Sequence, residues 1–516
     1  MAIERYTSGK RQFNWFNLFM VVCMSFGSMS YGYSASIIAT TLSQPAFLTY
    51  MGLDTRGNAT SLISTMNGLY QVGGFLGVFS VSFFTDKYGR KVAIAVCAAI
   101  CIFSAALLAG SVNPAMFIVF RFTSGAGAFM ILSAVPIWMN EVVPPRDRGL
   151  LVDIHGAALL FGYMISIWIG YGFYHLESPH AWRAPLAFQA LPPLILLCLL
   201  PLMPESPRFL LMKDRYEEAE KQLKRLHTPE EAAHELQQIS NQMRVDRTLP
   251  SSYWIMLKKP SYRKRVLIAL GTTCGIQFSG ILVINNYGPI LYASLGYDVP
   301  KQLVLLGGWI TLAFGCGCLG VFIIDRMPRP KLIGLGIAGC MVCLIVEAAL
   351  VANFADSTNA PALKAAVAAF YVYVVFYEMC LDGTQFAYLG ELFPTHLRAK
   401  GELVSWLVRK KGFADIFVTG MNIGVAGICL MNIIWLQAAP TAFDNIGWKF
   451  YLCFIIPGSL AAVGIFLFFP DTWGVPLEEV AAIFGDVDEL YAGNENDEIE
   501  MAKAKKSSAT HIEAVG

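Results

Sequence analysis

The chain has 516 residues, of which 55% are hydrophobic and 15% are charged, and its formal net charge is +1. Soluble proteins carry charge on roughly a quarter of their residues, so this composition excludes an ordinary soluble domain and indicates a polytopic membrane protein. We expect the lipid bilayer as its surroundings and no nucleic acid as a partner.

Long apolar runs follow one another along the chain, each near the roughly 20 residues that cross a bilayer as an α-helix. The first run is too long and too polar in its flanks for a cleaved signal and shows no small-residue cleavage site, so we expect it to be retained as a helix. The sequence therefore predicts an all-α membrane protein with twelve transmembrane helices, near 16–39, 62–84, 92–110, 116–138, 151–173, 184–203, 266–290, 303–324, 332–352, 363–388, 416–438 and 448–469.

The basic residues are distributed unequally between the two sides of this predicted membrane topology. If the N-terminus is cytoplasmic, the outer loops keep only five of the 38 lysines and arginines, namely Arg56, Arg183, Lys301, Lys364 and Lys449. Cytoplasmic loops carry the excess of Lys and Arg, so both termini are predicted to be cytoplasmic. Asn58 opens an Asn-Ala-Thr sequon in the first outer loop and is a candidate glycosylation site.

The loops repeat the same pattern in the two halves of the chain. EVVPPRDRG (141–149) matches ELFPTHLRAKG (391–401), and DKYGRK (86–91) matches DRMPRPK (325–331). PESPRFL (204–210) and PDTWGVPL (470–477) close the two halves. Matched loops in the same order indicate a duplicated six-helix unit. The predicted division is an N-terminal bundle (1–203), a cytoplasmic linker with short amphipathic helices (204–265), a C-terminal bundle (266–469) and a tail (470–516).

The acidic and basic residues of the repeated loops suggest a gate. On the cytoplasmic side they can pair across the two halves, hold that side shut and separate when it opens. The residues expected in this gate are Asp86, Arg90, Glu141, Arg148, Asp325, Arg329, Glu391 and Arg398.

The motifs together resemble the sugar porter family of the major facilitator superfamily. The match includes DKYGRK, RFTSGAG at 121–127, PESPR at 204–208, QFSG at 277–280, YGP at 287–289, ELFPTHLRAKG and the P-D-T-x-G-x-x-L-E-E pattern at 470–479. This resemblance implies two pseudo-symmetric six-helix bundles, alternating access and a hexose-like substrate carried by facilitation or proton symport.

The chain departs from the family where the substrate site is expected. Family polar positions fall here on Gly156, Ile276, Leu282, Ala313, Ile428 and Cys429, and the family tryptophan of helix 10 is Phe386. A sugar needs many hydrogen bonds, because each unpaired hydroxyl costs free energy. The remaining candidates for substrate binding are Gln277, Asn285, Asn286, Thr384, Gln385, Phe386 and Asn432, with Tyr287 as a wall or gate. This set suits a sugar or polyol and leaves room for a less polar metabolite.

Proton coupling is the open question. The helix 1 position that carries Asp in the family's proton symporters is Ser34, so Arg121 loses that partner, which favours facilitation. Against this, the stretch EMCLDGTQ places Glu378 and Asp382 four residues apart within a predicted membrane helix. Intramembrane carboxyls usually mark pathways or binding sites. Asp382 is therefore predicted to bind substrate, carry a proton or pair with Arg121, while a purely structural role is the alternative.

Residues 402–423 are unusually polar for the start of the eleventh helix, which suggests an insertion or an error in the gene model. The sequence shows neither metal-ligand spacing nor a phosphate loop, so we expect no cofactor and no enzyme activity. We also expect the protein to be a monomer. The resemblance to the family implies that the protein is located in the plasma membrane. Two alternatives remain open, namely a transporter of a non-sugar metabolite and a nutrient sensor that does not transport.

Overall fold

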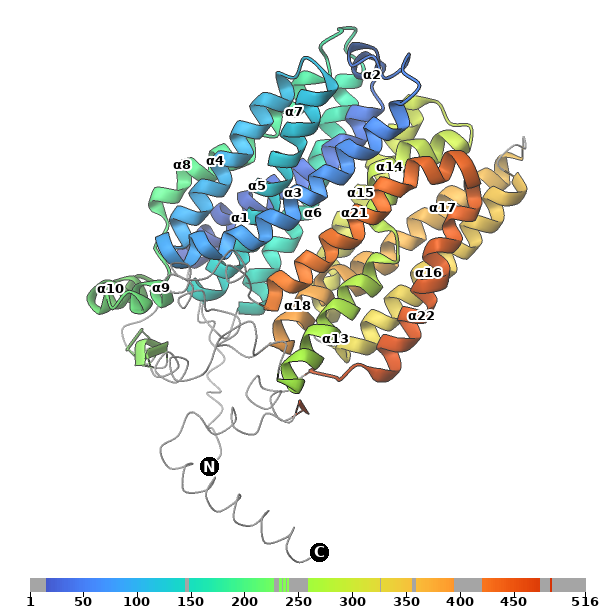
Figure 1. Cartoon of the computed structure of the whole chain (residues 1–516). Helices are drawn as coiled ribbons and strands as arrows, with labels where there is room; N and C mark the ends of the chain where they lie inside the picture. The colour runs from blue at the N-terminus through green and yellow to red at the C-terminus, as the bar shows by residue number, and fades with distance from the viewer. Residues whose placement is uncertain are drawn as a thin grey trace, which may run out of the picture.

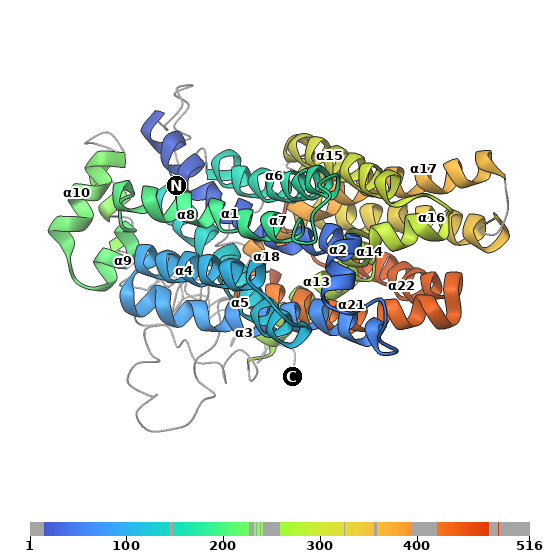
Figure 2. The same ribbon diagram turned by 90° about the horizontal axis from the view of Figure 1, so that it is seen from above.

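The computed structural model describes residues 15–143, 148–226, 259–324, 326–354, 359–393 and 420–473, together with short stretches within 232–240 and at 483–484; side chains are described at neither 148–153, 321 nor 420–422. The described residues form helices joined by short turns. Two groups of helices stand side by side, with the N-terminal group in blue to green and the C-terminal group in yellow-green to red (Figures 1 and 2).

The first group holds the helices up to residue 202. Its long members are apolar on nearly all sides, as expected for helices that meet either lipid or other helices. The elements are α1 (Trp15–Leu42), α2 (Pro45–Tyr50), α3 (Ala59–Tyr88), α4 (Arg90–Ala109), α5 (Pro114–Val142), α6 (Arg148–Tyr174), α7 (Arg183–Phe188), α8 (Leu191–Leu199) and the 3₁₀ turn η2 (Leu200–Leu202).

The second group repeats this arrangement with more interruptions. Its elements are α13 (Pro260–Gln277), α14 (Ile281–Ser294), α15 (Val299–Ile324), α16 (Arg329–Phe354), α17 (Ala360–Tyr377), the π-helical turn η3 (Glu378–Asp382), α18 (Gly383–Leu392), α21 (Gly420–Ile446), the 3₁₀ turn η5 (Gly447–Tyr451) and α22 (Leu452–Phe468).

Two of the membrane-crossing segments in the second group are broken near their middle. Between α13 and α14, Gly280 adopts φ of +75°, a left-handed conformation that costs glycine least. Between α17 and α18 the chain makes the π-helical turn η3. Such turns are rare and often occur at functional sites. Both breaks border the cavity described below.

Ten helical stretches in the described part of the chain are long and apolar enough to cross a membrane. One of them, Ile423–Phe468, contains both α21 and α22, and α1 adds a further 28-residue helix. Together they give the twelve crossings that the hydropathy pattern predicts. Large apolar side chains such as Leu460 and Phe468 are 71% and 80% exposed, as suits a surface that faces lipid.

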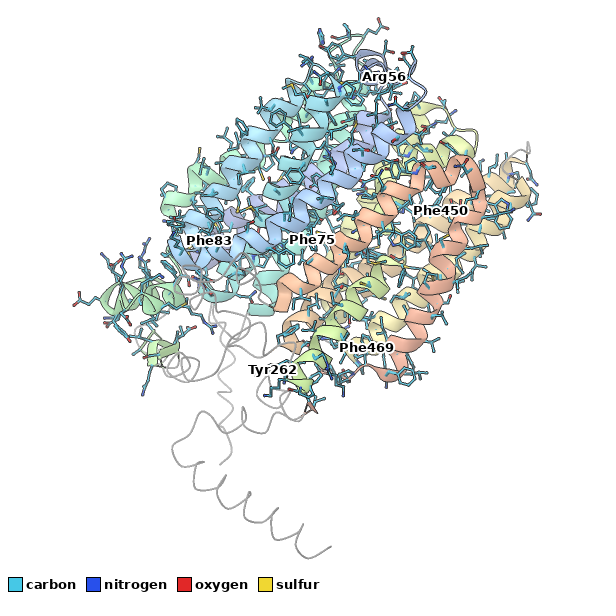
Figure 3. The ribbon with its side chains drawn as sticks, viewed as in Figure 1. Arg56, Phe75, Phe83, Tyr262, Phe450 and Phe469 are labelled. Atoms are coloured by element: carbon cyan, nitrogen blue, oxygen red, sulfur yellow. The ribbon has the colours of Figure 1, made fainter. Side chains whose placement is uncertain are left out.

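The two groups pack against each other through three helix pairs. α3 contacts α21, α6 contacts α15, and α1 contacts α14. Figure 3 shows the side chains, with Arg56 at the end of the molecule near α2 and Tyr262 near the opposite end. We call these the α2 end and the linker end.

The linker begins with two short helices, α9 (Pro207–Met212) and α10 (Tyr216–Leu226), which lie at the opposite end of the molecule from α2 (Figure 1). α10 is amphipathic and buries Ala219, Leu223 and Leu226. Asn17 at the start of α1 donates a hydrogen bond of 3.1 Å to the carbonyl oxygen of Leu226. The linker is therefore attached directly to the first helix.

Candidate functional site

A cavity lies between the two helix groups at the level of the two breaks. Its empty volume is about 660 Å³, including the part that is open to solvent. The lining residues come from both groups: Tyr31, Phe129, Leu132, Leu159, Leu160, Tyr163, Gln277, Ile281, Leu282, Asn285, Trp309, Ile310, Tyr377, Glu378, Asp382, Gln385, Phe386, Val425 and Ile428.

The two walls of this cavity differ in chemistry. The N-terminal group contributes leucines, Phe129 and two tyrosines, Tyr31 and Tyr163. The C-terminal group contributes all the carboxyl and amide side chains in the lining. Ligand pockets are usually apolar with a few placed polar groups, so specificity for polar ligands falls on the C-terminal wall.

The breaks in the helices place the polar side chains. Gln277 is the last residue of α13, Asn285 lies one turn into α14, and Gln385 follows the π-helical turn. Asn285 Oδ1 accepts a hydrogen bond of 3.3 Å from the hydroxyl of Ser36 in α1. By contrast, Gln277 Oε1 and Gln385 Oε1 are buried without a hydrogen-bond partner. These two acceptors are available to a ligand.

Glu378 and Asp382 both line the cavity, as the first and last residues of the π-helical turn. Glu378 is only 6% exposed, and its Oε2 has no hydrogen-bond partner. Asp382 Oδ1 accepts a hydrogen bond of 3.3 Å from Gln385 Nε2. The turn thus presents two carboxyl groups to the same cavity.

The predicted substrate residues divide into two sets. Gln277, Asn285, Gln385 and Phe386 line the cavity. The others lie outside the lining: Asn286, Thr384, Asn432 and Tyr287, each 5% exposed or less.

Tyr287 occupies a junction between the two groups. Its hydroxyl accepts a hydrogen bond of 2.9 Å from Asn67 Nδ2 in α3 and donates one of 2.9 Å to the carbonyl oxygen of Leu436 in α21. Thr60 donates to Asp444 Oδ2 at 3.3 Å across the same pair of helices, at the α2 end. Side-chain hydrogen bonds therefore join the two groups at this end.

Arg121 does not reach the cavity carboxyls. Its guanidinium stacks 4.2 Å from the ring centroid of Tyr70, and one Nη donates a 3.1 Å bond to the carbonyl oxygen of Ser34. The Ser34 hydroxyl bonds to Ser124, Tyr70 and Gln189 instead of acting as a counter-charge. The predicted option that Asp382 pairs with Arg121 is wrong for this conformation, because the Arg121 guanidinium bonds to Ser34 and stacks on Tyr70.

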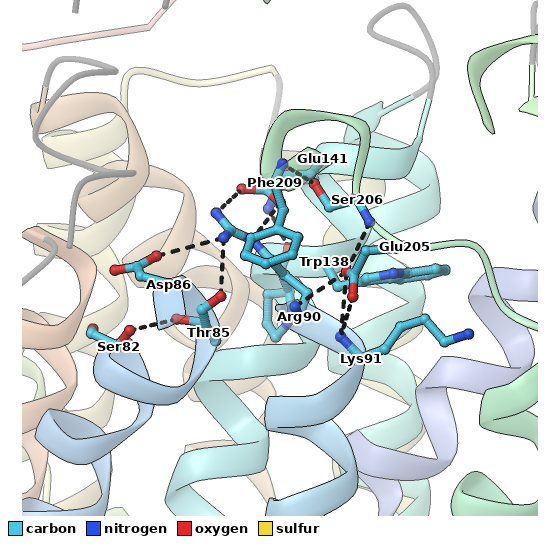
Figure 4. Close-up of polar contacts among 12 residues, drawn as sticks. Ser82, Thr85, Asp86, Arg90, Lys91, Trp138, Glu141, Glu205, Ser206 and Phe209 are labelled. Atoms are coloured by element: carbon cyan, nitrogen blue, oxygen red, sulfur yellow. Dashed lines mark hydrogen bonds and ion pairs between the residues drawn. The ribbon is translucent and has the colours of Figure 1, made fainter. Parts of the chain in front are cut away.

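The linker end carries a dense ionic cluster (Figure 4). Arg90 Nε and Nη2 donate to the two carboxylate oxygens of Glu141 at 2.8 Å each, and Asp86 lies 3.5 Å from Nη1. Glu205 accepts bonds from the backbone N–H groups of Arg90 and Ser206 at 3.1 and 2.9 Å. Burial raises the pKa of the Glu205 carboxyl, and these N–H donors oppose that rise.

The second group contains the corresponding pair. Arg329 donates to Glu391 at 3.0 Å, and Glu391 also accepts a 2.5 Å bond from the Thr472 hydroxyl. The expectation that these residues pair across the two halves is wrong for Arg90–Glu141 and Arg329–Glu391, since each pair lies within one group. The side chains of three other predicted gate residues, Arg148, Asp325 and Arg398, lie outside the described residues.

Sequence reasoning missed part of the cavity lining. Tyr31, Tyr163 and Trp309 lie in runs that read as ordinary apolar helix, so no local signal marked them. Asn67, the partner of Tyr287, did carry a local signal, since it is a polar residue within an apolar helix. Glu347 in α16 is 1% exposed, and neither carboxylate oxygen has a hydrogen-bond partner among the described residues.

The fold and the central cavity define a membrane transporter built from two helix bundles. The model of the family "Sugar (and other) transporter" matches residues 20–410. The chain therefore belongs to this family, and it is a transporter rather than an enzyme.

Individual relatives agree with this assignment. The chain is 27% identical to the MFS-type transporter criB of Aspergillus cristatus, over 88% of this chain and 90% of that protein. It is 27% identical to a probable quinate permease of Aspergillus clavatus, over 93% and 90%. It is 26% identical to a high-affinity glucose transporter of Kluyveromyces lactis, over 89% and 82%.

A solved structure shares the fold. The major facilitator proton:xylose symporter XylE, bound to 6-bromo-6-deoxy-D-glucose, superposes with a TM-score of 0.75 at 21% identity, covering 92% of this chain and all of XylE. The predicted family and major facilitator fold are confirmed by these comparisons. Residues 402–419 of the predicted insertion and most of the tail lie outside the described residues, while 420–423 form the start of α21.

Proposed function

We propose that the chain carries a sugar or sugar-like polyol across the membrane by alternating access around the central cavity. The observation that carries this proposal is the wall of amide and carboxyl side chains that Gln277, Asn285, Asp382 and Gln385 form at the breaks in the helices. A hydroxylated ligand would supply the donors that the unpartnered oxygens of Gln277 and Gln385 lack. Several relatives are named as transporters of sugars or of quinate, which supports a hydroxylated substrate.

We propose further that Asp382 carries a proton together with the substrate. The carboxyl lines the cavity, and its hydrogen-bond partner Gln385 lines it too. Protonation of Asp382 would therefore change the hydrogen bonding available to the substrate in the same space. Asp382 is therefore better placed than Arg121 to link the proton and the substrate, because Arg121 bonds to Ser34 and stacks on Tyr70.

The gate proposal takes a modified form. We propose that Asp86, Arg90 and Glu141 in one half, and Arg329 and Glu391 in the other, hold each bundle rigid at its cytoplasmic end, so that the bundles rock as units. With Arg148, Asp325 and Arg398 they form the predicted cytoplasmic set. At the opposite face, the Tyr287–Asn67 bond would be made when the outer side is closed.

The proposed setting is the plasma membrane, with both termini cytoplasmic and the chain monomeric. In this orientation the α2 end is extracellular, and Asn58, which is exposed before α3, is accessible to glycosylation. The linker helices α9 and α10 then lie on the cytoplasmic side.

A second candidate function is transport of a less polar metabolite. The observation that favours it is the apolar half of the lining, where Leu282 and Ile428 replace polar family positions and Phe386 replaces the family tryptophan. A sensor that does not transport is the third candidate, and uptake measurements separate it from both transporters.

The test is uptake of labelled glucose and labelled glucitol by a yeast strain that lacks its own hexose carriers, with and without a protonophore. Uptake that the protonophore abolishes supports a proton-coupled carrier of hydroxylated substrates. Uptake that ignores the protonophore overturns the proton step but keeps the transport proposal. If neither compound enters cells that display the protein at their surface, the sugar or polyol proposal is wrong.

A further inference from the structure

The cavity is lined by two carboxyl groups, those of Glu378 and Asp382, and its lining contains no Lys, Arg or His side chain among the described residues. The buried Arg121 of the N-terminal group stacks on Tyr70 and bonds to Ser34. A buried carboxylate without a partner is costly, so a cation that enters the cavity is stabilised there.

The unsatisfied polar atoms around the two carboxyl groups are hydrogen-bond acceptors that have no donor. The buried oxygens without a hydrogen-bond partner at this wall are Glu378 Oε2, Gln277 Oε1 and Gln385 Oε1, on residues that are 6%, 3% and 2% exposed. They lie on three different elements, η3, α13 and α18. A ligand group with several N–H donors and a positive charge supplies the donors that such oxygens lack, and a primary ammonium has three of them.

Aromatic rings make up much of the remaining lining. They are Tyr31, Phe129, Tyr163, Trp309, Tyr377 and Phe386. Tyr163 and Tyr377 thus line the same cavity as Glu378 and Asp382. Ring faces attract cations, which makes a combination of carboxyls and aromatic rings suited to organic ammonium groups.

The Glu378 carboxylate lies beside α15. Its Oε2 is 3.7 Å from the point that a Cβ on Gly317 of α15 would occupy, which is an ordinary van der Waals distance. Glu378 and Asp382 are the first and last residues of the π-helical turn, and both line the cavity.

We propose that Glu378 and Asp382 form a cation subsite of the transport cavity, and that the substrates include hydroxylated primary amines whose ammonium group occupies it. This inference rests on the proposed transport of hydroxylated molecules. A neutral polyol would enter together with a proton on the pair, whereas an amino-polyol brings its own positive charge.

The experiment compares two ligands that differ only at C1, where an ammonium replaces a hydroxyl, using the full chain in lipid nanodiscs. D-glucitol and 1-amino-1-deoxy-D-glucitol are titrated, and their Kd values are measured at neutral pH. We expect the amine to bind at least about tenfold more tightly. The preference should disappear in E378Q/D382N and persist in the matched control E347Q, which removes a buried carboxyl outside the cavity.

The outcomes separate the two proposals. Equal binding of both ligands overturns the cation subsite and leaves polyol transport standing. If neither ligand binds to the folded protein, the polyol proposal fails, and benzylammonium against benzyl alcohol then decides the subsite: carboxyl-dependent preference for the ammonium supports it, and no preference overturns it. If the double variant does not fold, the wild-type comparison and the single variants E378Q and D382N decide in the same way.

Discussion

The ion pair between Arg90 and Glu141 offers the sharpest test of the structure. The Arg90 side chain is 2% exposed and that of Glu141 is 7% exposed, and two hydrogen bonds of 2.8 Å join them. Removing one partner of a buried pair costs about 3–5 kcal/mol. Asp86, 3.5 Å from Arg90, remains as a partial partner. We therefore expect Glu141→Gln to cost about 3 kcal/mol, at the lower limit of that range.

The assay is thermal unfolding of the detergent-solubilised protein, followed by fluorescence-detected size exclusion. A loss of 1 kcal/mol lowers Tm by about 2–4 °C in domains of 150–250 residues, which is the size of one helix bundle. Glu141→Gln should then lower Tm by roughly 6–12 °C. The matched control is Glu220→Gln, which removes an ion pair with Lys224. The Glu220 side chain is 47% exposed and that of Lys224 is 57% exposed. Exposed pairs contribute about 0–1 kcal/mol, so Tm should barely change.

A double-mutant cycle with Arg90→Met completes this test. Removing both charges avoids leaving one charge buried alone, so R90M/E141Q should be more stable than the sum of the single variants predicts. If Glu141→Gln lowers Tm no more than Glu220→Gln, the argument from burial is wrong for this pair. If the stability losses of the two single variants add up to that of the double variant, the energetic coupling between Arg90 and Glu141 is refuted as well.

Three further predictions follow from the cavity and the helix contacts. Asp382→Asn should abolish uphill accumulation but leave counterflow exchange intact, as measured with labelled substrate in vesicles; accumulation that survives the change contradicts the proton step. Tyr287→Phe removes the bond with Asn67 between the halves, which contributes about 1 kcal/mol, and should raise the population open at the α2 end about fivefold. Pulsed EPR distances between the α2 ends of α3 and α21 would report this shift, and an unchanged distribution argues against a gate there. Gly73→Ala should cost about 1–3 kcal/mol or more, because the new Cβ would lie 2.0 Å from a backbone carbonyl oxygen of α5. The control is Gly464→Ala, whose Cβ meets nothing within 4 Å and should leave Tm unchanged. Equal melting temperatures for the two variants would refute this packing argument.

The positions of the helices were predictable because hydropathy is a local property. A helix that crosses a bilayer must be apolar over its own length, whatever its neighbours are. The repeated loop motifs were local too, and they identified the residues of the ionic clusters at the linker end. Their pairing was not local: Arg90 meets Glu141 within one bundle, although charge alone would equally allow a partner in the other.

The cavity residues likewise divide into those that the sequence marked and those that it did not. Gln277, Asn285, Gln385 and Asp382 were visible as polar residues within apolar helices, and such residues rarely face lipid. Tyr31, Tyr163 and Trp309 were not visible, because an aromatic residue in a membrane helix can equally face lipid, core or cavity.

Which face of a helix lines a cavity depends on how neighbouring helices pack and where they break. The left-handed Gly280 and the π-helical turn at Glu378–Asp382 set those faces here. The sequence by itself thus determined the twelve crossings, the duplication and the family. Tertiary structure alone decided that the two carboxyls share one cavity and that Arg121 bonds elsewhere, because both depend on contacts between helices far apart in the chain.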